Sequence, residues 1–405
     1  MAAEKYWLWL AAQSNVSARA KAALIAHYGS AEEAFFAPSG AFLRLPGLTE
    51  REAALLEARD TSRMDAILSA CHALGVDVVT MQDADYPARL KSIFAPPVAL
   101  FVQGSLKGLE ETAAISVIGT RGATPYGLKM GRRMAYEIAS SGGIVVTTLS
   151  PGIDEAAARG ALLGGGRCIG VLGCAHSERP QALYRDIAAT GALISEYPPG
   201  TITQKSFFRE RNRVAAGLSL AVAVVEAPER SGTMLFVQEA LEQGKEIFAV
   251  PGNADAANSA GTNALLKQGA RPATCGWDVL SEFAQLYPDR LHLSRASMPE
   301  EQASAPARET LPAPSRETQP TPAKKKEIDK EKPKGYIDLR DQLSGLSAEQ
   351  LEIITAIGKG QQHIDDIIEA TGYPAAKVLA QLTVLEIKGY ISRSAGKRIS
   401  LNIKR

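Results

Sequence analysis

The chain has 405 residues, with 45 Lys and Arg against 44 Asp and Glu, so its net charge is only +1 and any nucleic-acid surface must be a local patch. This length exceeds one ordinary hydrophobic core and predicts two or three domains. No apolar run reaches the roughly 18–20 residues that a membrane helix needs, which excludes a membrane-spanning protein of the helical class.

The N-terminus lacks the basic stretch, long apolar core and small-residue cleavage site of a signal peptide. The cysteines are scattered and form no C-x-x-C pair, which argues against a disulfide framework or a zinc site. We therefore expect a cytoplasmic protein without a bound metal. The cysteines are Cys71, Cys168, Cys174 and Cys275.

Residues 1–74 are rich in Ala, Leu and Glu at helical spacing and predict a small helical domain. Within it, residues 42–49 resemble a helix–hairpin–helix motif, in which a tight turn at Gly47 exposes backbone N–H groups to a DNA phosphate. The motif usually has a second glycine where this chain has Thr49, a residue suited to cap the next helix. DNA contact stays open, although the missing glycine favours a scaffold role.

Residues 75–290 predict an α/β fold: a Rossmann-like, mostly parallel sheet with helices on both faces. Short β-branched runs without alternation are typical of strands buried on both faces, and helices between strands imply right-handed crossovers. Predicted strands cover residues 114–118, 144–148, 167–172, 192–195, 219–225 and 246–250. Predicted helices lie near residues 125–141, 154–163, 180–189, 232–243 and 262–268.

Two further regions complete the chain. Residues 291–340 are rich in Pro, Lys and Glu and nearly free of large apolar side chains, which predicts a disordered linker. Residues 341–405 show three helical patterns followed by two short strands, the pattern of a winged helix. Weak DNA contact and protein docking are equally open for this domain. Its predicted wing carries only basic charges: Lys388, Arg393, Lys397, Arg398, Lys404 and Arg405.

The unusual residues of the predicted sheet domain follow the ends of its strands, where doubly wound sheets bind ligands. The loop after the first strand opens a helix, whose N-terminus offers N–H groups and a positive dipole to a phosphate. The arginine in this loop adds a bidentate partner for the same group. The loop consists of Gly119, Thr120, Arg121 and Gly122.

Later segments bring more polar groups toward the same edge. Residues 207–217, expected as a loop before a buried strand, place three arginines and an asparagine beside two aromatics, as phosphate clamping and base stacking require. Residues 231–233 bring hydroxyl groups to the start of the next helix. The remaining candidate DNA-binding residues are Ser150, Gly152, Phe208, Arg209, Arg211, Asn212, Arg213, Ser231, Gly232 and Thr233.

No catalytic constellation is recognisable in the sequence. It contains no H-E-x-x-H or G-x-S-x-G motif, no G-x-G-x-x-G dinucleotide loop and no Walker loop. We therefore assign no catalytic residue and no cofactor. Acids at predicted strand ends, Glu196 and Glu226, leave hydrolysis open.

Taken in chain order, these segments resemble the DNA-processing protein A (DprA, also Smf) family. The resemblance covers residues 75–275, and the helical N-terminal domain and the winged helix are similar to the family's architecture. The matching motifs are V-I-G-T-R at 117–121, G-I-D at 152–154, I-S-E-Y-P at 194–198, F-x-x-R-N-R at 208–213, V-V-E-A at 224–227, S-G at 231–232 and F-A-V-P-G at 248–252.

The resemblance implies a non-enzymatic protein that binds single-stranded DNA, protects incoming DNA during natural transformation and helps load the RecA recombinase. It also implies a homodimer formed through the Rossmann-like domain, for which we expect residues 240–275, with Val250, Leu265 and Leu266, to supply the surface. The residues that match the family's DNA-facing motifs are Gly119 to Arg121, Arg211 to Arg213, Ser231 and Gly232.

The chain also departs from the family pattern. In the S-G-x-x-R-G-I-D loop, at residues 147–154, Thr148 and Pro151 replace the glycine and the arginine, and Ala158 replaces a later histidine. The stretch at residues 174–180 is shortened, so one rim of the site is altered. Arg179 and Lys205 are candidates for the missing basic contact.

Two alternative functions stay open. The first is a nucleotide-binding or nucleoside-monophosphate-hydrolysing Rossmann-like protein that uses Glu226. The second is an adaptor whose pocket senses a nucleotide while its winged helix binds a partner protein. Release of free base would favour the hydrolase.

Overall fold

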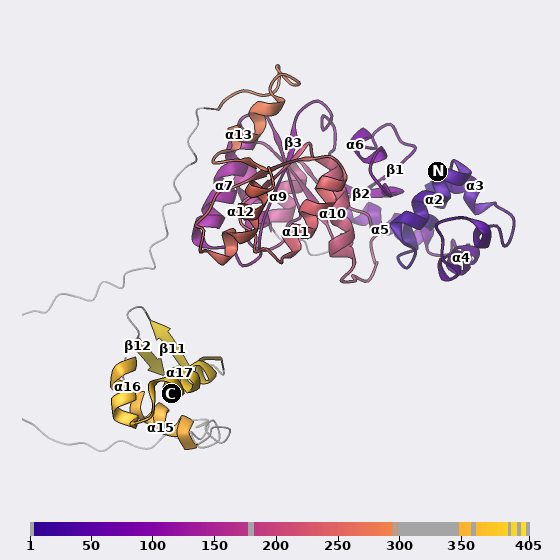
Figure 1. The fold of residues 1–405 in the computed structure, drawn as a ribbon. Coiled ribbons are helices and arrows are strands. Elements are labelled where there is room, and N and C mark those ends of the chain that lie inside the picture. The colour runs from indigo at the N-terminus through magenta and orange to yellow at the C-terminus, as the bar shows by residue number, and fades with distance from the viewer. Residues whose placement is uncertain are drawn as a thin grey trace, which may run out of the picture. The chain divides into compact units, whose positions relative to one another are not determined.

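The computed structural model describes residues 4–176, 182–294, 298, 348–357, 362–387, 390–394 and 398–401. The chain divides into two compact units, residues 1–308 and 309–405, which have separate hydrophobic cores (Figure 1). The predicted disordered linker at 291–340 lies outside the described residues, except for residues 291–294 and 298.

Short helices form the N-terminal part of the first unit, as predicted. They bury Trp9, Leu24 and Phe42 in a core that also contains Phe101 of the sheet. Thr49 caps a helix through a capping box with Glu52, which confirms its predicted capping role. DNA contact by the hairpin turn stays a prediction. The helices are α1 (Glu4–Ala12), α2 (Ala18–Tyr28), α3 (Ala31–Phe35), α4 (Glu50–Glu57) and α5 (Met64–Leu74).

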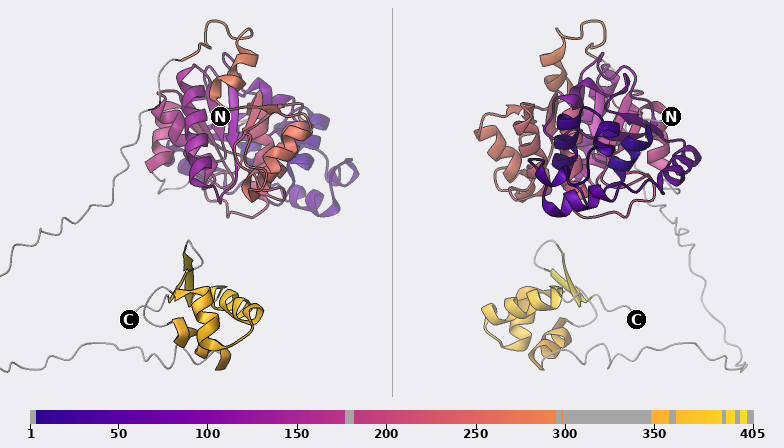
Figure 2. Two further views of the ribbon diagram at one scale, coloured as in Figure 1. Left: turned by 60° about the vertical axis from the view of Figure 1, so that its left-hand side comes forward. Right: turned by 90° about the vertical axis from the view of Figure 1, so that its right-hand side faces the viewer.

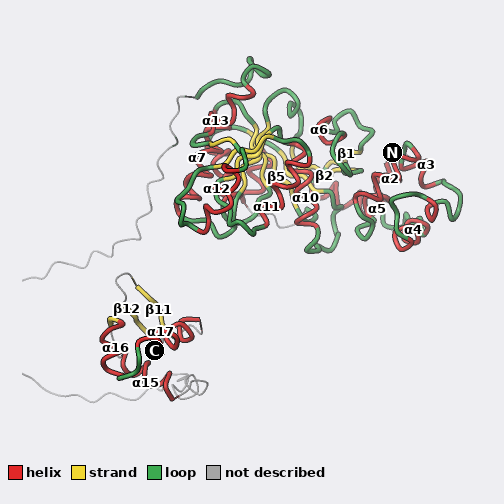
Figure 3. Tube along the Cα trace, in the orientation of Figure 1, coloured by secondary structure: helices red, strands yellow, loops and turns green. Residues whose placement is uncertain are grey.

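Within the described residues, a nine-stranded sheet has the order β1-β2-β6-β5-β4-β3-β7-β8-β9. Figure 3 shows its strands in yellow. Pairing is parallel from β6 across to β9, which confirms the predicted mostly parallel sheet. The first two strands, which the sequence did not predict, add an antiparallel edge. The strands are β1 (Asp77–Thr80), β2 (Ala99–Gly104), β3 (Ala114–Ile118), β4 (Ile144–Thr147), β5 (Arg167–Leu172), β6 (Ala192–Ser195), β7 (Ala221–Val224), β8 (Glu246–Ala249) and β9 (Arg271–Pro272).

Helices cover both faces of the sheet, as predicted (Figure 2). The alternation of β3 shows why its residues are apolar throughout, because Ile115 and Val117 pack on one face while Ala114 and Ile118 pack on the other. One face is covered by α7 (Pro125–Ser140), α8 (Ile153–Leu163), α9 (Ala182–Thr190) and α13 (Gly276–Leu280). The other is covered by α6 (Ala88–Lys91), α10 (Phe207–Leu218), α11 (Gly232–Glu242) and α12 (Ala260–Lys267).

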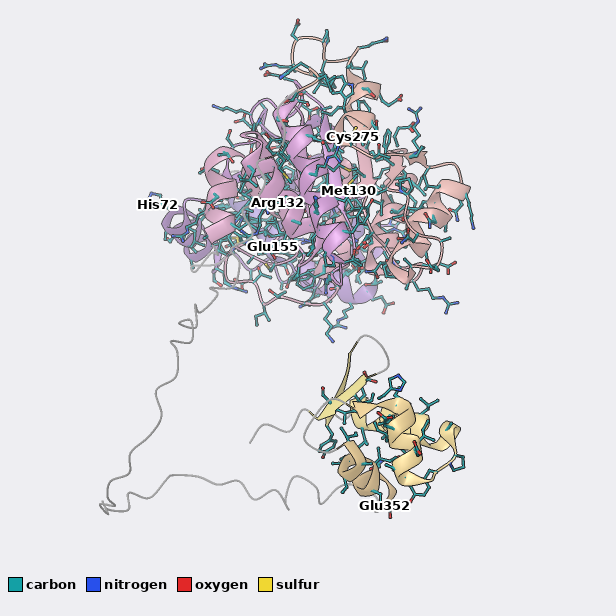
Figure 4. All side chains as sticks on the ribbon, turned by 90° about the vertical axis from the view of Figure 1, so that its left-hand side faces the viewer. His72, Met130, Arg132, Glu155, Cys275 and Glu352 are labelled. Atoms are coloured by element: carbon teal, nitrogen blue, oxygen red, sulfur yellow. The ribbon has the colours of Figure 1, made fainter. Side chains whose placement is uncertain are left out.

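The helices α7 and α8 lie side by side, as the positions of Met130, Arg132 and Glu155 show (Figure 4). A Cβ atom added at Gly160 of α8 would lie 2.1 Å from the backbone oxygen of Arg132. Glycine is therefore required where these two helices touch.

Two expectations from the sequence are wrong. Residues 207–217 form most of the helix α10 rather than a loop, because Phe207, Val214 and Leu218 recur at helical spacing and are buried, a period that the intervening charges obscure. The predicted dimer surface is also wrong at Val250 and Leu265. Their exposed fractions are 2% and 3%, and they pack in the cores on either side of the sheet.

The second unit contains the three helices and the hairpin predicted for a winged helix. Ile357, Val378, Leu382 and Leu385 form its core, and a short strand adds to the hairpin. The side chains of the predicted basic wing lie outside the described residues. The elements are α15 (Ala348–Ile357), β10 (Gln362–His363), α16 (Ile364–Thr371), α17 (Ala375–Ile387), β11 (Ile391–Ser394) and β12 (Arg398–Leu401).

No helix in the described part of the chain is long and apolar enough to cross a membrane. The four cysteines are free thiols. Among the described residues, no group of three or more His, Cys, Asp or Glu is arranged to hold a metal ion.

Candidate nucleic-acid interface

A pocket of about 410 Å³ opens at the carboxyl edge of the parallel strands. Chain order reverses at β3, since β4 to β6 lie on one side of it and β7 to β9 on the other, and doubly wound sheets bind ligands at such a point. Of the predicted site residues, Gly122, Gly152 and Arg213 do not line the pocket. Those that line it are Gly119, Thr120, Arg121, Ser150, Phe208, Arg209, Arg211, Asn212, Ser231, Gly232 and Thr233.

The buried carboxylate of Glu226 binds the loop after β3. Its Oε2 accepts from the backbone N–H of Thr124 at 2.9 Å, and its Oε1 accepts from the Thr124 hydroxyl at 2.6 Å. Thr124 also caps α7 by accepting from the Gly127 N–H. A Cβ at Gly127 would lie 2.2 Å from Glu226 Oε2, so the carboxylate fills the space that this glycine leaves. Glu226 thus holds the loop of Arg121 in place.

Asp154 joins the loops after β3 and β4. Its carboxylate accepts from the N–H groups of Gly119, at 3.1 Å, and Thr148, at 3.3 Å, and from the Thr148 hydroxyl. Burial raises the pKa of Asp154, while these hydrogen bonds and the nearby Arg211 oppose the shift. The side chain therefore organises two loops of the pocket in addition to its position at the start of α8.

Arg211 is 5% exposed and binds the ends of neighbouring strands rather than solvent. Its Nη1 donates to the backbone oxygens of Thr148 and, at 2.8 Å, Val171, and its Nη2 donates to Ser150 Oγ at 3.0 Å. Burial lowers the pKa of Arg211 to about 10, and Asp154 opposes this shift. Most of the donors on this guanidinium are occupied, so Arg211 supports the pocket floor.

Three other basic side chains face solvent at the pocket: Arg121, Lys205 and Arg209. Within the described part of the chain, none of these side chains forms a hydrogen bond or ion pair. Cations that are exposed and not neutralised by protein partners are suited to bind phosphate groups. Lys205, a candidate for the missing basic contact, lines the pocket.

The N-terminus of α11 completes the polar side of the pocket. Ser231 occupies the N-cap position, yet its hydroxyl forms no capping bond. The Oγ atom is buried and has no hydrogen-bond partner among the described residues. A polar atom without a partner at a helix N-terminus is typical of a site that an anion completes.

Two of the predicted glycines shape the loops without lining the pocket. Gly152 has a φ of +92°, and a Cβ there would lie 2.5 Å from the backbone oxygen of Thr120, so the loops after β3 and β4 touch at this point. Gly122 is exposed and accepts from Asn258 Nδ2 at 2.8 Å.

Arg213 lies outside the pocket, in contrast to its predicted place among the DNA-facing arginines. It is 7% exposed, and its Nη2 donates to both carboxylate oxygens of Glu196, at 2.5 and 2.7 Å. The alternation of arginines in the sequence does not distinguish these roles, because the helix directs Arg213 toward a buried acid.

A second hollow of about 520 Å³ shares Arg121, Lys205 and Phe208 with the first. Its other walls include Leu172 and Tyr184, and it is bounded by the loop in which Pro151 and Thr148 replace the family's arginine and glycine. Phe208 is 40% exposed between the two hollows. Arg179 lies outside the described residues, so its proposed contact has no structural description.

Comparison with known proteins gives consistent matches. The family model described as DNA recombination-mediator protein A matches residues 77–284, and that of the DprA winged helix domain matches residues 339–397. DNA processing protein DprA of Bacillus subtilis is 34% identical over 227 residues, which cover 55% of this chain and 76% of the relative. Protein Smf of Escherichia coli is 28% identical over 367 residues, covering 89% and 86%.

The fold is also similar to a solved structure. The X-ray structure of DNA processing protein A from Streptococcus pneumoniae superimposes with a TM-score of 0.60 at 28% identity. The match covers 69% of this chain and 97% of that one. The similarity therefore extends over almost the whole of the pneumococcal chain.

Proposed function

The chain belongs to the DNA recombination-mediator protein A (DprA/Smf) family, and from this we propose that it binds single-stranded DNA as its principal function. The proposal extends to protection of incoming DNA in the cytoplasm and to loading of RecA during natural transformation. It also includes a homodimer formed through the Rossmann-like domain. These finer roles rest on the family alone.

The observation that carries the proposal is that Ser231, whose hydroxyl has no hydrogen-bond partner among the described residues, lines the same pocket as three exposed cations. Ser231 and the start of α11 offer hydrogen-bond donors at one side of the pocket, and Arg121, Lys205 and Arg209 bring positive charge. A phosphate between them would be bound by both.

The two adjoining hollows favour a polymer over a mononucleotide. The first is lined by polar loops, whereas the second has apolar walls that include Leu172 and Tyr184. Phe208, exposed between them, offers an aromatic face on which an unpaired base stacks. Phosphate-binding and aromatic sites that alternate match the repeat of a single strand.

A non-enzymatic role is part of the same proposal. Both carboxylate oxygens of Glu226 accept hydrogen bonds from Thr124, and those of Asp154 accept from two loops. A general base must reach its substrate, and the Glu226 carboxylate does not line the pocket and instead faces the protein. The hydrogen bonds that occupy these carboxylates argue against a hydrolase.

Titration of a labelled oligonucleotide at several salt concentrations tests DNA binding. We expect Arg121→Ala to weaken binding about tenfold and to reduce the salt slope by about 0.7, the contribution of one phosphate contact on a single strand. The control is Arg159→Ala, since Arg159 is exposed but paired with Glu155 outside the pocket. Equal affinity of wild type and Arg121→Ala at all salt concentrations would remove Arg121 from the site.

A further inference from the structure

A buried charge cluster lies beside the pocket, on residues that do not line it. We call Lys21, Glu196, Glu210 and Arg213 the Glu196 cluster. Glu196 and Arg213 are 9% and 7% exposed, and Arg213 Nη2 donates to both carboxylate oxygens of Glu196 between the end of β6 and α10. A buried pair of this kind is weak support for stability as such but strongly fixes the geometry of the elements that carry it.

The N-terminal helices supply the third charge of this cluster. Lys21 of α2 is 5% exposed, and its Nζ donates to the backbone oxygen of Ala11 at 3.2 Å. Burial lowers the pKa of Lys21 to about 8, and the charges of Glu196 and Glu210 oppose this shift. Gln204 Nε2 donates to Asn15 Oδ1 at 3.4 Å, so the segment before α10 contacts the loop between α1 and α2.

Glu210 and the first residue of α10 are held by the segment after β6. The Tyr197 hydroxyl donates to Glu210 Oε2 at 3.0 Å, and the Tyr197 ring stacks on Phe207 at a centroid distance of 3.7 Å. Farther along, Gln243 Nε2 donates to the backbone oxygen of Arg213. The helix that bears Phe208 and Arg211 is therefore fixed from several sides.

We propose that Glu196 is a positioning residue for DNA binding, which orients α10 through Arg213 and links it to the N-terminal helices through Lys21. The inference rests on the proposed single-stranded DNA binding. Glu196 does not line the pocket, so it acts on the ligand through the placement of Phe208 and Arg209. The N-terminal helices are then part of the support of the site, in addition to any ligand contact of their own.

The sign of the effect on affinity separates positioning from simple electrostatics. Removing an acid near a phosphate site strengthens binding if only charge matters, since repulsion is relieved. Loss of positioning weakens binding instead. We expect Glu196→Gln to raise the oligonucleotide Kd about tenfold, within the range found for coupling through packed contacts. Glu229→Gln removes an exposed acid two residues before Ser231 and should leave the Kd unchanged or lower it.

The experiment uses the full-length protein, with fluorescence anisotropy for binding and hydrogen exchange for the amides of α10. Faster exchange in α10 together with weaker binding in Glu196→Gln supports the inference. Binding as tight as wild type, or α10 exchange as slow as wild type, overturns it. If wild type itself does not bind the oligonucleotide, the proposed function fails, while the exchange measurement still decides whether Glu196 positions α10.

A second variant covers the case in which Glu196→Gln does not fold. Lys21→Gln removes the charge and keeps an N–H donor for the Ala11 oxygen. Arg19→Gln makes the same charge change at an exposed position of α2. We expect a Kd several-fold higher for Lys21→Gln than for Arg19→Gln, and equal values would overturn the inference.

Discussion

Arg121 and Arg211 line one pocket, yet their guanidinium groups have opposite environments. Arg121 is exposed and forms no side-chain hydrogen bond within the described residues, whereas Arg211 donates to three acceptors around the ends of β4 and β5. Hydrogen bonds of a buried charged group stabilise the fold, and their loss leaves carbonyl oxygens without partners. Arg121 is therefore available to bind a ligand, whereas Arg211 binds acceptors of the protein itself.

This difference predicts a large loss of stability on substitution of Arg211 and a small change on substitution of Arg121. Arg211→Met should lower the free energy of unfolding by about 2–4 kcal/mol, because two backbone oxygens and Ser150 Oγ lose their donor. Arg121→Met should change it by less than about 0.5 kcal/mol. Urea denaturation followed by circular dichroism measures both, and equal loss in the two variants would contradict the assigned roles.

The sequence predicted which residues line the pocket better than it predicted the role of each residue. It located the loops after β3 and β7 because glycine, hydroxyl and arginine side chains follow buried strands there. It did not distinguish the roles of Arg209, Arg211 and Arg213. The partners that define two of these roles, Val171 for Arg211 and Glu196 for Arg213, are distant in the chain. Such partners are defined only when the sheet is assembled.

At the scale of elements, the helix N-termini around the pocket differ in a measurable way. Thr124 caps α7 through its hydroxyl, and that hydroxyl is bonded in turn to Glu226. Ser231 occupies the same position of α11 without a capping bond. The cap of α7 is thus complete, whereas the Ser231 hydroxyl at α11 has no partner in the part of the chain that the structure describes.

From this contrast we predict that Ser231→Ala leaves thermal stability almost unchanged but weakens oligonucleotide binding several-fold, because the hydroxyl serves the ligand. Thr124→Ala should cost about 1–2 kcal/mol of folding free energy, the usual value of a lost cap. Calorimetry and anisotropy on both variants provide the comparison. A large drop in melting temperature for Ser231→Ala would show that its hydroxyl is structural after all.

The parallel strands and the helices between them were predictable because their apolar runs and periodicity are local. The antiparallel edge was not, since β1 and β2 follow no helix–strand alternation and pair with β6 from far along the chain. Helix α10 was missed for another reason. Its charged residues are buried by tertiary contacts, which contradict the usual link between charge and exposure.

At the scale of the whole molecule, the described residues of each unit form hydrophobic cores of their own, and none of these cores contains residues from both units. Separate cores unfold independently unless an interface couples them. We expect removal of residues 309–405 to leave the unfolding free energy of the first unit within about 0.5 kcal/mol of its value in the full chain. Matching urea curves for the truncated and full-length proteins would confirm this, and a large shift would show coupling.

We expect the free energy of unfolding to depend on pH through Lys21 of the N-terminal helices. Burial lowers the pKa of Lys21 from its usual 10.5 to about 8, an effect that Glu196 and Glu210 oppose. Between these values the unfolded chain binds more protons than the folded one, so stability increases with pH across this window. Relative to Lys21→Met, wild type should gain up to about 3 kcal/mol between pH 8 and 10.5.

Urea unfolding of both proteins at several pH values measures this difference directly. Arg19→Met, exposed on the same helix, serves as the control and should follow wild type. A constant difference between wild type and Lys21→Met across the window would show that Lys21 is not buried as a cation in solution.

The contact of Gly152 with the Thr120 backbone also has a kinetic consequence. Because the two loops touch through main-chain atoms, with Asp154 bonded to both, the pocket floor has little freedom to rearrange when a ligand arrives. Association should then be governed by diffusion and long-range charge attraction, without a slow conformational step. Substitutions of uncharged residues at the pocket are expected to change the lifetime of the complex far more than its rate of formation.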